Sequence, residues 1–239
     1  MKATEFEFRY RFWLIGLIFW LAFSTYGFDH VDITQAIADR FAHPGGLDAD
    51  SLVRIVFVCG TLLVAGACLI RTWATAYLRS EVVHDSNLHS ESLVADGPYR
   101  RVRNPLYLGN IFLALGMGTI TSRTGFVILV GGMILFVLRL IGREEAQLDV
   151  EHGERFREFC RRVPRLWPAL LPRVPAGGLQ PRWGQAFVGE IFIWGFFVGM
   201  LAFAITLKIA LLWIFVAAGI LFRILLSSVQ SRQGKTGTR

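Results

Sequence analysis

Apolar residues gather in six stretches along the chain, and charged residues fill the segments between them. Crossing the hydrocarbon core of a bilayer takes about 20 mostly apolar residues in a helix. Strands are not expected at these lengths, because an open sheet edge leaves backbone groups unsatisfied in lipid. The pattern predicts an all-α, polytopic transmembrane helical bundle of about six spans: 12–28, 52–70, 105–120, 125–141, 186–207 and 209–226.

The third and fourth stretches are short and are separated only by residues 121–124, which predicts a tight helical hairpin. Asn104 and Pro105 open the third stretch, and Asn is favoured as an N-cap while Pro suits the first helical turn. An outward third span and a returning fourth span would bring Asn104 and Glu144 to the same side of the membrane.

The first stretch follows Lys2, Arg9 and Arg11, as the apolar part of a cleaved secretory signal peptide does. Acidic Glu5 and Glu7 stand among those basic residues, and no small-x-small cleavage site follows the stretch. We therefore expect a retained membrane anchor.

Charge differs between the two sides of the predicted membrane. The loop after the first stretch holds five Asp residues against Arg40, whereas the N-terminus, the segments after the second and fourth stretches, and the C-terminal tail are basic. Lys and Arg concentrate in cytoplasmic segments. The chain is thus expected to be an integral membrane protein with both termini in the cytoplasm, in the inner or plasma membrane if it is bacterial.

The chain has 25 Lys and Arg against 18 Asp and Glu, a net charge of +7. The basic residues flank apolar stretches and form no nucleic-acid-binding motif, so anionic lipid headgroups are the expected partner. Cys59 and Cys68 share one predicted span and Cys160 is cytoplasmic, so neither a disulfide framework nor a metal site is expected.

Two cytoplasmic segments separate the predicted spans. In the second, residues 143–162 have helical composition with a kink expected at Gly153, and their apolar side is formed by Leu148, Phe156, Phe159 and Val163. A Pro- and Gly-rich linker at 172–178 follows. We divide the chain into an anchor with its loop (1–51), a core of helices and cytoplasmic segments (52–170), and a linker, last hairpin and tail (171–239).

Three clusters near the predicted membrane boundaries carry candidate chemistry: the run 97–109, the Gly116-Met117-Gly118 triplet, and Glu144-Glu145. Taken singly, such glycines favour helix packing and such carboxylates favour a solvated helix end. Gly195 and Gly199 form a GxxxG pair, which predicts a helix contact through which copies of the chain could associate. Arg139 and Glu190 lie inside predicted spans, where snorkelling and function are both open.

The run Gly-Pro-Tyr-Arg-x-Val-Arg-Asn-Pro-x-Tyr-x-Gly, the later Glu-Glu and the charged stretch 155–168 resemble the isoprenylcysteine carboxyl methyltransferase and phospholipid methyltransferase superfamily, over about 52–168. The resemblance implies S-adenosylmethionine bound at the cytoplasmic face by the hairpin and the charged segment after it. Its implied cofactor-binding residues are Val94, Gly97, Tyr99, Arg103, Asn104, Pro105, Tyr107, Leu108, Gly109, Gly116, Gly118, Glu144 and Glu145.

The resemblance leaves the methyl acceptor open. A carboxylate of the isoprenylcysteine type would suit an arginine clamp such as Arg162 or Arg165. A phospholipid amine must lose a proton first, which would suit Glu145. Many members have His where this chain has Asn104, and Asn cannot titrate near neutral pH, so a general base at that position is disfavoured.

Two other functions stay open at this stage. An NADPH-dependent sterol-type membrane reductase shares a related C-terminal pattern, and a non-catalytic transporter or scaffold is compatible with six spans. We favour a membrane methyltransferase acting on a lipid or lipophilic small molecule, with S-adenosylmethionine as its cofactor.

Overall fold

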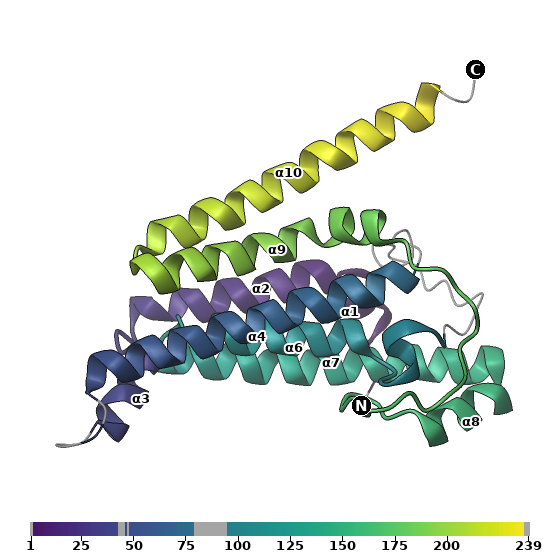
Figure 1. The fold of residues 1–239 in the computed structure, drawn as a ribbon, viewed down its shortest axis with the longest axis horizontal. Helices are drawn as coiled ribbons and strands as arrows, with labels where there is room; N and C mark the ends of the chain where they lie inside the picture. The colour runs from purple at the N-terminus through teal and green to yellow at the C-terminus, as the bar shows by residue number, and fades with distance from the viewer. Residues whose placement is uncertain (1, 43–45, 47, 79–94, 237–239) are drawn as a thin grey trace.

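The computed structural model describes residues 2–42, 46, 48–78 and 95–236. Apart from one isolated bridge between Asp32 and Ser122, every regular element in this part is a helix, which confirms the all-α prediction (Figure 1). The helices are α1 (Glu5–Arg9), α2 (Arg11–Ser24), η1 (Thr25–Gly27), α3 (Ile33–Phe41), α4 (Ala49–Tyr77), η2 (Gly97–Arg100), α6 (Pro105–Gly118), α7 (Arg123–His152), α8 (Glu154–Arg162), α9 (Trp183–Thr206) and α10 (Ile209–Thr236).

Three helices of the described part, α4, α7 and α9, are long and apolar enough to cross a membrane. The other apolar helices, Arg11–Gly27, Pro105–Gly118 and Ile209–Phe222, are shorter. A helix rises about 1.5 Å per residue, so the 14 residues of α6 reach only about two thirds of a hydrocarbon core of about 30 Å. An integral membrane protein is supported, whereas the predicted count of six spans is not confirmed.

Three helices run further than the hydropathy pattern predicts, among them α10, which continues to Thr236 where the predicted span ends at 226. The second predicted span stops at residue 70, but α4 continues to Tyr77, and the fourth stops at 141, but α7 continues to His152. Hydropathy marks where side chains become polar, and backbone hydrogen bonding carries the helix past that point. The predicted break is present at Gly153, whose positive φ of 52° separates α7 from α8.

The bundle is arranged around α4 and the α6–α7 hairpin. α4 packs between α6 and α9, α2 packs on α7, and α9 packs on α10, which leaves the bundle obliquely towards the C-terminus (Figure 1). Val64 of α4, Met117 of α6 and Met133 of α7 lie in the shared apolar core. A side chain on Gly116 would lie 2.6 Å from the Gly60 carbonyl, so the α4–α6 contact needs this glycine.

The bundle has two ends, the polar end and the turn end. The polar end comprises η2, the start of α6, the end of α7 and α8; the turn end comprises α3, the end of α6 and the α9–α10 turn (Figure 1). The prediction that the hairpin gathers its start and its end on one side is thus met at the polar end. Which end faces the cytoplasm stays a prediction.

The GxxxG pair on α9 faces α10 of the same chain. A side chain on Gly195 would lie 3.0 Å from the Phe215 carbonyl, and one on Gly199 would lie 2.8 Å from the Leu212 carbonyl. The predicted helix contact is therefore made within the chain, and association of copies stays a prediction.

Arg139, which could have been a snorkelling side chain, is instead paired with the N-terminal helix. Its Nε and second guanidinium nitrogen donate to the two carboxylate oxygens of Glu7 at 3.0 and 2.7 Å. These hydrogen bonds lower the pKa of Glu7 to about 2. This ion pair links α1 to α7 near the polar end.

Candidate functional site

Glu145 lies at the centre of the polar end and joins three parts of the chain. Its carboxylate is 3.4 Å from a guanidinium nitrogen of Arg103 and 2.8 Å from one of Arg165. It also accepts a hydrogen bond of 3.4 Å from the Asn104 amide. The Glu145 side chain is 18 % exposed, so most of this charge is shielded from water and is balanced by the two arginines.

Asn104 departs from the role that its position suggests. It occupies the N-cap of α6, but its side chain makes no capping hydrogen bond. Instead it donates to Glu145 and to the Arg165 carbonyl, the latter at 3.1 Å. Asn104 thus links α7 to the segment after α8 and leaves the first amides of α6 without a cap from its own side chain.

Glu144, the neighbour of Glu145, points to a different partner. It accepts a hydrogen bond of 2.6 Å from the hydroxyl of Tyr107, on the first turn of α6. The positive charge of Arg11 also stabilises the charged form of Glu144. The two adjacent carboxylates therefore have different surroundings, since Glu145 is held by two arginines and an amide while Glu144 is held by a phenol.

Tyr99 supplies a buried hydroxyl with no hydrogen-bond partner among the described residues. Its side chain is held inside by the η2 turn, where Gly97 has a φ of 55° and packs so closely on the Tyr77 ring that a side chain there would clash. Burial raises the pKa of Tyr99 well above its usual value. Buried nitrogens Nε of Arg103 and Arg143 are likewise unpaired within the described part.

Unpaired buried polar atoms are uncommon in proteins, because each costs about 1–3 kcal/mol when nothing replaces its hydrogen bonds to water. Tyr99 and Arg103 are both on the run 97–109, and Arg143 is next to Glu144. The polar end therefore has hydrogen-bonding capacity that the described residues do not use, as a ligand site does.

The segment after α8 lies along η2 and holds it in place. Backbone amides of Ala169 and Arg173 donate to the carbonyls of Arg101 and Arg100 at 2.9 and 2.8 Å. The buried carboxylate of Asp96 accepts from the amides of Gly177 and Leu179 at 2.8 and 3.0 Å. No local signal in the sequence indicates that Asp96 binds a segment about 80 residues later.

A cavity of about 410 Å³ lies between the end of α4, η2 and this segment. Its lining includes aromatic Trp73 and Tyr77, and the polar residues Asp96, Arg100 and Arg101. A volume in this range is typical of small-molecule sites, which run from about 300 to 1,000 Å³.

The predicted site residues divide between the two ends of the bundle. Tyr99, Arg103, Asn104, Tyr107, Glu144, Glu145 and Arg165 come together at the polar end, where Gly97, Pro105 and Leu108 support them. The structure does not bring Gly116 and Gly118 there. They lie at the opposite end of α6, against Val64 and Phe126.

Three further predicted residues have other surroundings. Gly109 packs on Arg71, whose side chain would be 2.4 Å from a side chain added at that glycine. Arg162 is more than half exposed and pairs with Glu158 on α8, away from Glu145. Val94 lies outside the described residues.

One buried ionic cluster was missed in the sequence. Arg71 on α4 pairs with Glu190 on α9 through Nε at 2.7 Å, and Glu190 also accepts from Thr75 at 2.8 Å. Arg71 additionally donates to Asn110 on α6 at 2.6 Å. Glu190 lies inside a predicted span, but its partner Arg71 follows the predicted end of another span by one residue, where hydropathy alone does not indicate a buried ion pair.

Residues 55–155 match the family described as phospholipid methyltransferase, which confirms the family resemblance over this segment. The matched range contains η2, α6 and α7, and thus all of the polar-end cluster except Arg165. The structure therefore gathers, at one end of the bundle, the motif residues on which the resemblance rests.

Two relatives are named as metal-resistance proteins. The chain is 27 % identical over 140 residues to the cobalt-zinc-cadmium resistance protein CzcN of Cupriavidus metallidurans, covering 59 % of this chain and 62 % of the relative. It is 28 % identical over 111 residues to the nickel-cobalt-cadmium resistance protein NccN of Alcaligenes xylosoxydans xylosoxydans, covering 46 % of this chain and 49 % of the relative. No solved structure gives a significant match.

Proposed function

We propose, from the phospholipid methyltransferase domain at residues 55–155, that this protein is a membrane methyltransferase that moves a methyl group from S-adenosylmethionine to a lipophilic acceptor. The observation that carries the proposal is the cluster at the polar end. Two carboxylates, two arginines, an amide and two phenols from η2, α6, α7 and the segment after α8 meet there.

The residues present fit this cofactor. Glu145 has acceptor lone pairs beyond those that its two arginines use, and these suit the amino group or ribose hydroxyls of the cofactor. The unpaired nitrogen of Arg103 and the hydroxyl of Tyr99 also have hydrogen bonds still to make. A cavity of about 410 Å³ lies against η2, the turn that also carries Tyr99, and with Trp73 and Tyr77 in its wall it has room and aromatic surface for a purine ring. When bound, the cofactor supplies a methyl group on a positively charged sulfur.

Two effects of the chain would serve the reaction. Carboxylates near the site help to bind the cationic cofactor. A half-buried pocket excludes water while it aligns donor and acceptor, which favours the transfer. Of the two carboxylates, Glu145 is already neutralised by Arg103 and Arg165. Glu144, held by the neutral hydroxyl of Tyr107, is the better proton acceptor, so we assign the general-base role to Glu144 for an acceptor that must lose a proton.

The same contacts favour one class of acceptor over another. Arg162, one of the two predicted clamps for a carboxylate, points to Glu158, and Arg165 is occupied by Glu145. The arrangement therefore supports a lipid amine or thiol, deprotonated at Glu144, better than it supports a carboxylate.

Calorimetric titration of the purified protein with S-adenosylmethionine tests the cofactor site. We expect micromolar binding by the wild type, and a loss of about tenfold or more for Glu145→Gln, since a hydrogen bond to a charged group contributes about 1.5–3 kcal/mol. Glu158→Gln is the matched control, because that exposed carboxylate lies on α8 outside the cluster. The proposal would be refuted if the wild type bound S-adenosylmethionine only in the millimolar range or bound NADPH tightly. Equal affinity of Glu145→Gln and Glu158→Gln for S-adenosylmethionine would refute it as well.

A further inference from the structure

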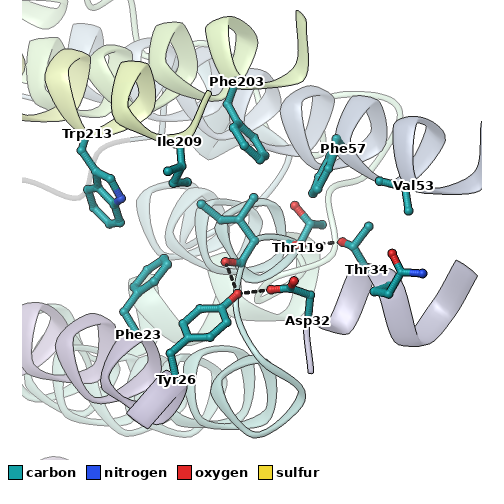
Figure 2. Close-up of a pocket in the computed structure, with 12 residues that line it drawn as sticks. Phe23, Tyr26, Asp32, Thr34, Val53, Phe57, Thr119, Phe203, Ile209 and Trp213 are labelled. Carbon is teal, nitrogen blue, oxygen red and sulfur yellow. Dashed lines mark hydrogen bonds between the residues drawn. The ribbon is translucent and has the colours of Figure 1, made fainter. Parts of the chain in front are cut away.

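A second cavity, of about 450 Å³, lies at the turn end of the bundle (Figure 2). It is lined by residues of α2, η1, α3, α4, α9 and α10, together with Asp32 before α3 and Thr119 and Ile120 after α6. Asn104 and Thr119 stand at the two ends of α6, about 20 Å apart at the helical rise. The cavity is therefore separate from the proposed methyl-transfer site, and nothing in the function proposed above uses it.

The walls of this cavity are aromatic and join the last hairpin to the rest of the bundle. Phe23 of α2 meets Trp213 of α10 edge to face, with ring centres 5.2 Å apart. Phe57 of α4 meets Phe203 of α9 in the same way at 4.9 Å. Figure 2 shows these rings around the open space. They offer an apolar lining and several π faces to whatever occupies it.

One side of the cavity carries hydrogen-bond acceptors. The Asp32 carboxylate accepts a hydrogen bond from the Tyr26 hydroxyl, which also lies 3.0 Å from the Ile120 carbonyl. The Thr34 hydroxyl donates to the carbonyl of Thr119 (Figure 2). Both carbonyls follow the C-terminus of α6, where the helix dipole adds partial negative charge. The described residues that line the cavity include no Lys or Arg, so a negative potential dominates this side.

We propose that this cavity binds an amphipathic ammonium compound, with its cationic head beside Asp32 and its apolar part among the aromatic rings. A cation is stabilised both by a carboxylate and by the faces of aromatic rings, so both parts of the lining favour the same ligand. An anion would meet the Asp32 carboxylate and the two carbonyls without a compensating donor of positive charge. Ile209 and Trp213 of α10 form part of the wall, which places the apolar part of the ligand beside an apolar helix.

Binding of octyltrimethylammonium to the protein in a neutral maltoside detergent tests this site, with octanesulfonate as the anionic counterpart. We expect saturable calorimetric binding of the cation only. Asp32→Asn and Trp213→Leu should each weaken it by about tenfold or more, since each removes one of the two cation-binding features. Asp50→Asn is the matched control, because that exposed carboxylate lies at the start of α4 outside the cavity.

Trp213→Leu keeps the test valid if Asp32→Asn fails to fold. Equal binding of the anion, or unchanged binding in every variant that folds, would overturn the proposal. Adding an ethanolamine phospholipid to the micelles then identifies the natural ligand. Displacement of the probe indicates a lipid headgroup, and undiminished probe binding indicates a free amphiphile. Both outcomes support an ammonium site in this cavity. Titrating S-adenosylmethionine into the Asp32→Asn variant separates this test from that of the proposed function. We expect the variant to bind S-adenosylmethionine as tightly as the wild type does.

Discussion

At the residue scale, the adjacent side chains of Glu144 and Glu145 lie in different environments. A motif shows that Glu144 and Glu145 lie near the run 97–109, but it does not show which side chain each meets. That choice depends on side-chain direction around α7, and it assigns the arginines to Glu145 and the Tyr107 phenol to Glu144. The same limit explains Arg162 and Arg165, of which only the second reaches Glu145.

Tyr99→Phe is the sharpest single-residue test of a ligand at the polar end. This change removes a hydroxyl that is buried and unpaired within the described residues. The free energy of unfolding should therefore stay the same or rise by up to about 1–3 kcal/mol. Affinity for S-adenosylmethionine should nevertheless fall severalfold, because the hydroxyl is then lost to the ligand. The measurements are thermal unfolding in detergent and calorimetric titration of the same preparation.

Tyr26→Phe provides the comparison for that experiment. Its hydroxyl already has partners in Asp32 and Ile120, at the other end of the bundle. This variant should lose about 1 kcal/mol of stability and keep its affinity for S-adenosylmethionine. The reverse pattern, with Tyr99→Phe less stable and equally able to bind, would show that the Tyr99 hydroxyl serves the fold alone.

At the element scale, the hairpin was predictable and the helix ends were not. A short apolar pair with a turn between them, opened by Asn104-Pro105, determines α6 and α7 because nothing else satisfies the backbone in lipid. The second predicted span ends at residue 70, whereas the helix α4 continues two turns further to Tyr77. Arg71, which follows the apolar stretch, therefore lies inside the helix and pairs with Glu190.

The Arg71–Glu190 pair joins α9 to α4. Both charges are almost fully buried, with 11 % and 1 % of their side chains exposed. Glu190→Gln should destabilise the protein by about 3–5 kcal/mol, because it leaves the Arg71 charge uncompensated. The double variant Arg71→Met with Glu190→Leu should recover most of that loss, since an apolar pair of similar volume needs no partner.

Unfolding midpoints of the single and double variants check this account. A double variant less stable than Glu190→Gln would contradict it and would show that Arg71 stabilises α6 through Asn110 independently of Glu190. Because Arg71 also packs on Gly109, the S-adenosylmethionine affinity of the double variant shows in addition whether this contact positions the start of α6.

At the scale of the whole molecule, the bundle presents two chemically different ends. The polar end holds the family motif residues around Glu145, and the turn end holds an aromatic cavity beside Asp32. The apolar pattern was enough to predict a helical membrane protein with a last hairpin, but not that α9 and α10 would help to form the second cavity. That cavity depends on Phe203 and Trp213 meeting rings more than 140 residues earlier in the chain.

The most direct test of the central claim is transfer of a labelled methyl group from S-adenosylmethionine into membrane lipid. Purified protein is incubated with labelled S-adenosylmethionine and total membrane lipid extracts. We predict label in an amine- or thiol-bearing lipid, with little or none for Glu144→Gln and wild-type levels for Glu158→Gln. Absence of label from every extract, or equal labelling by Glu144→Gln and the wild type, would contradict the account.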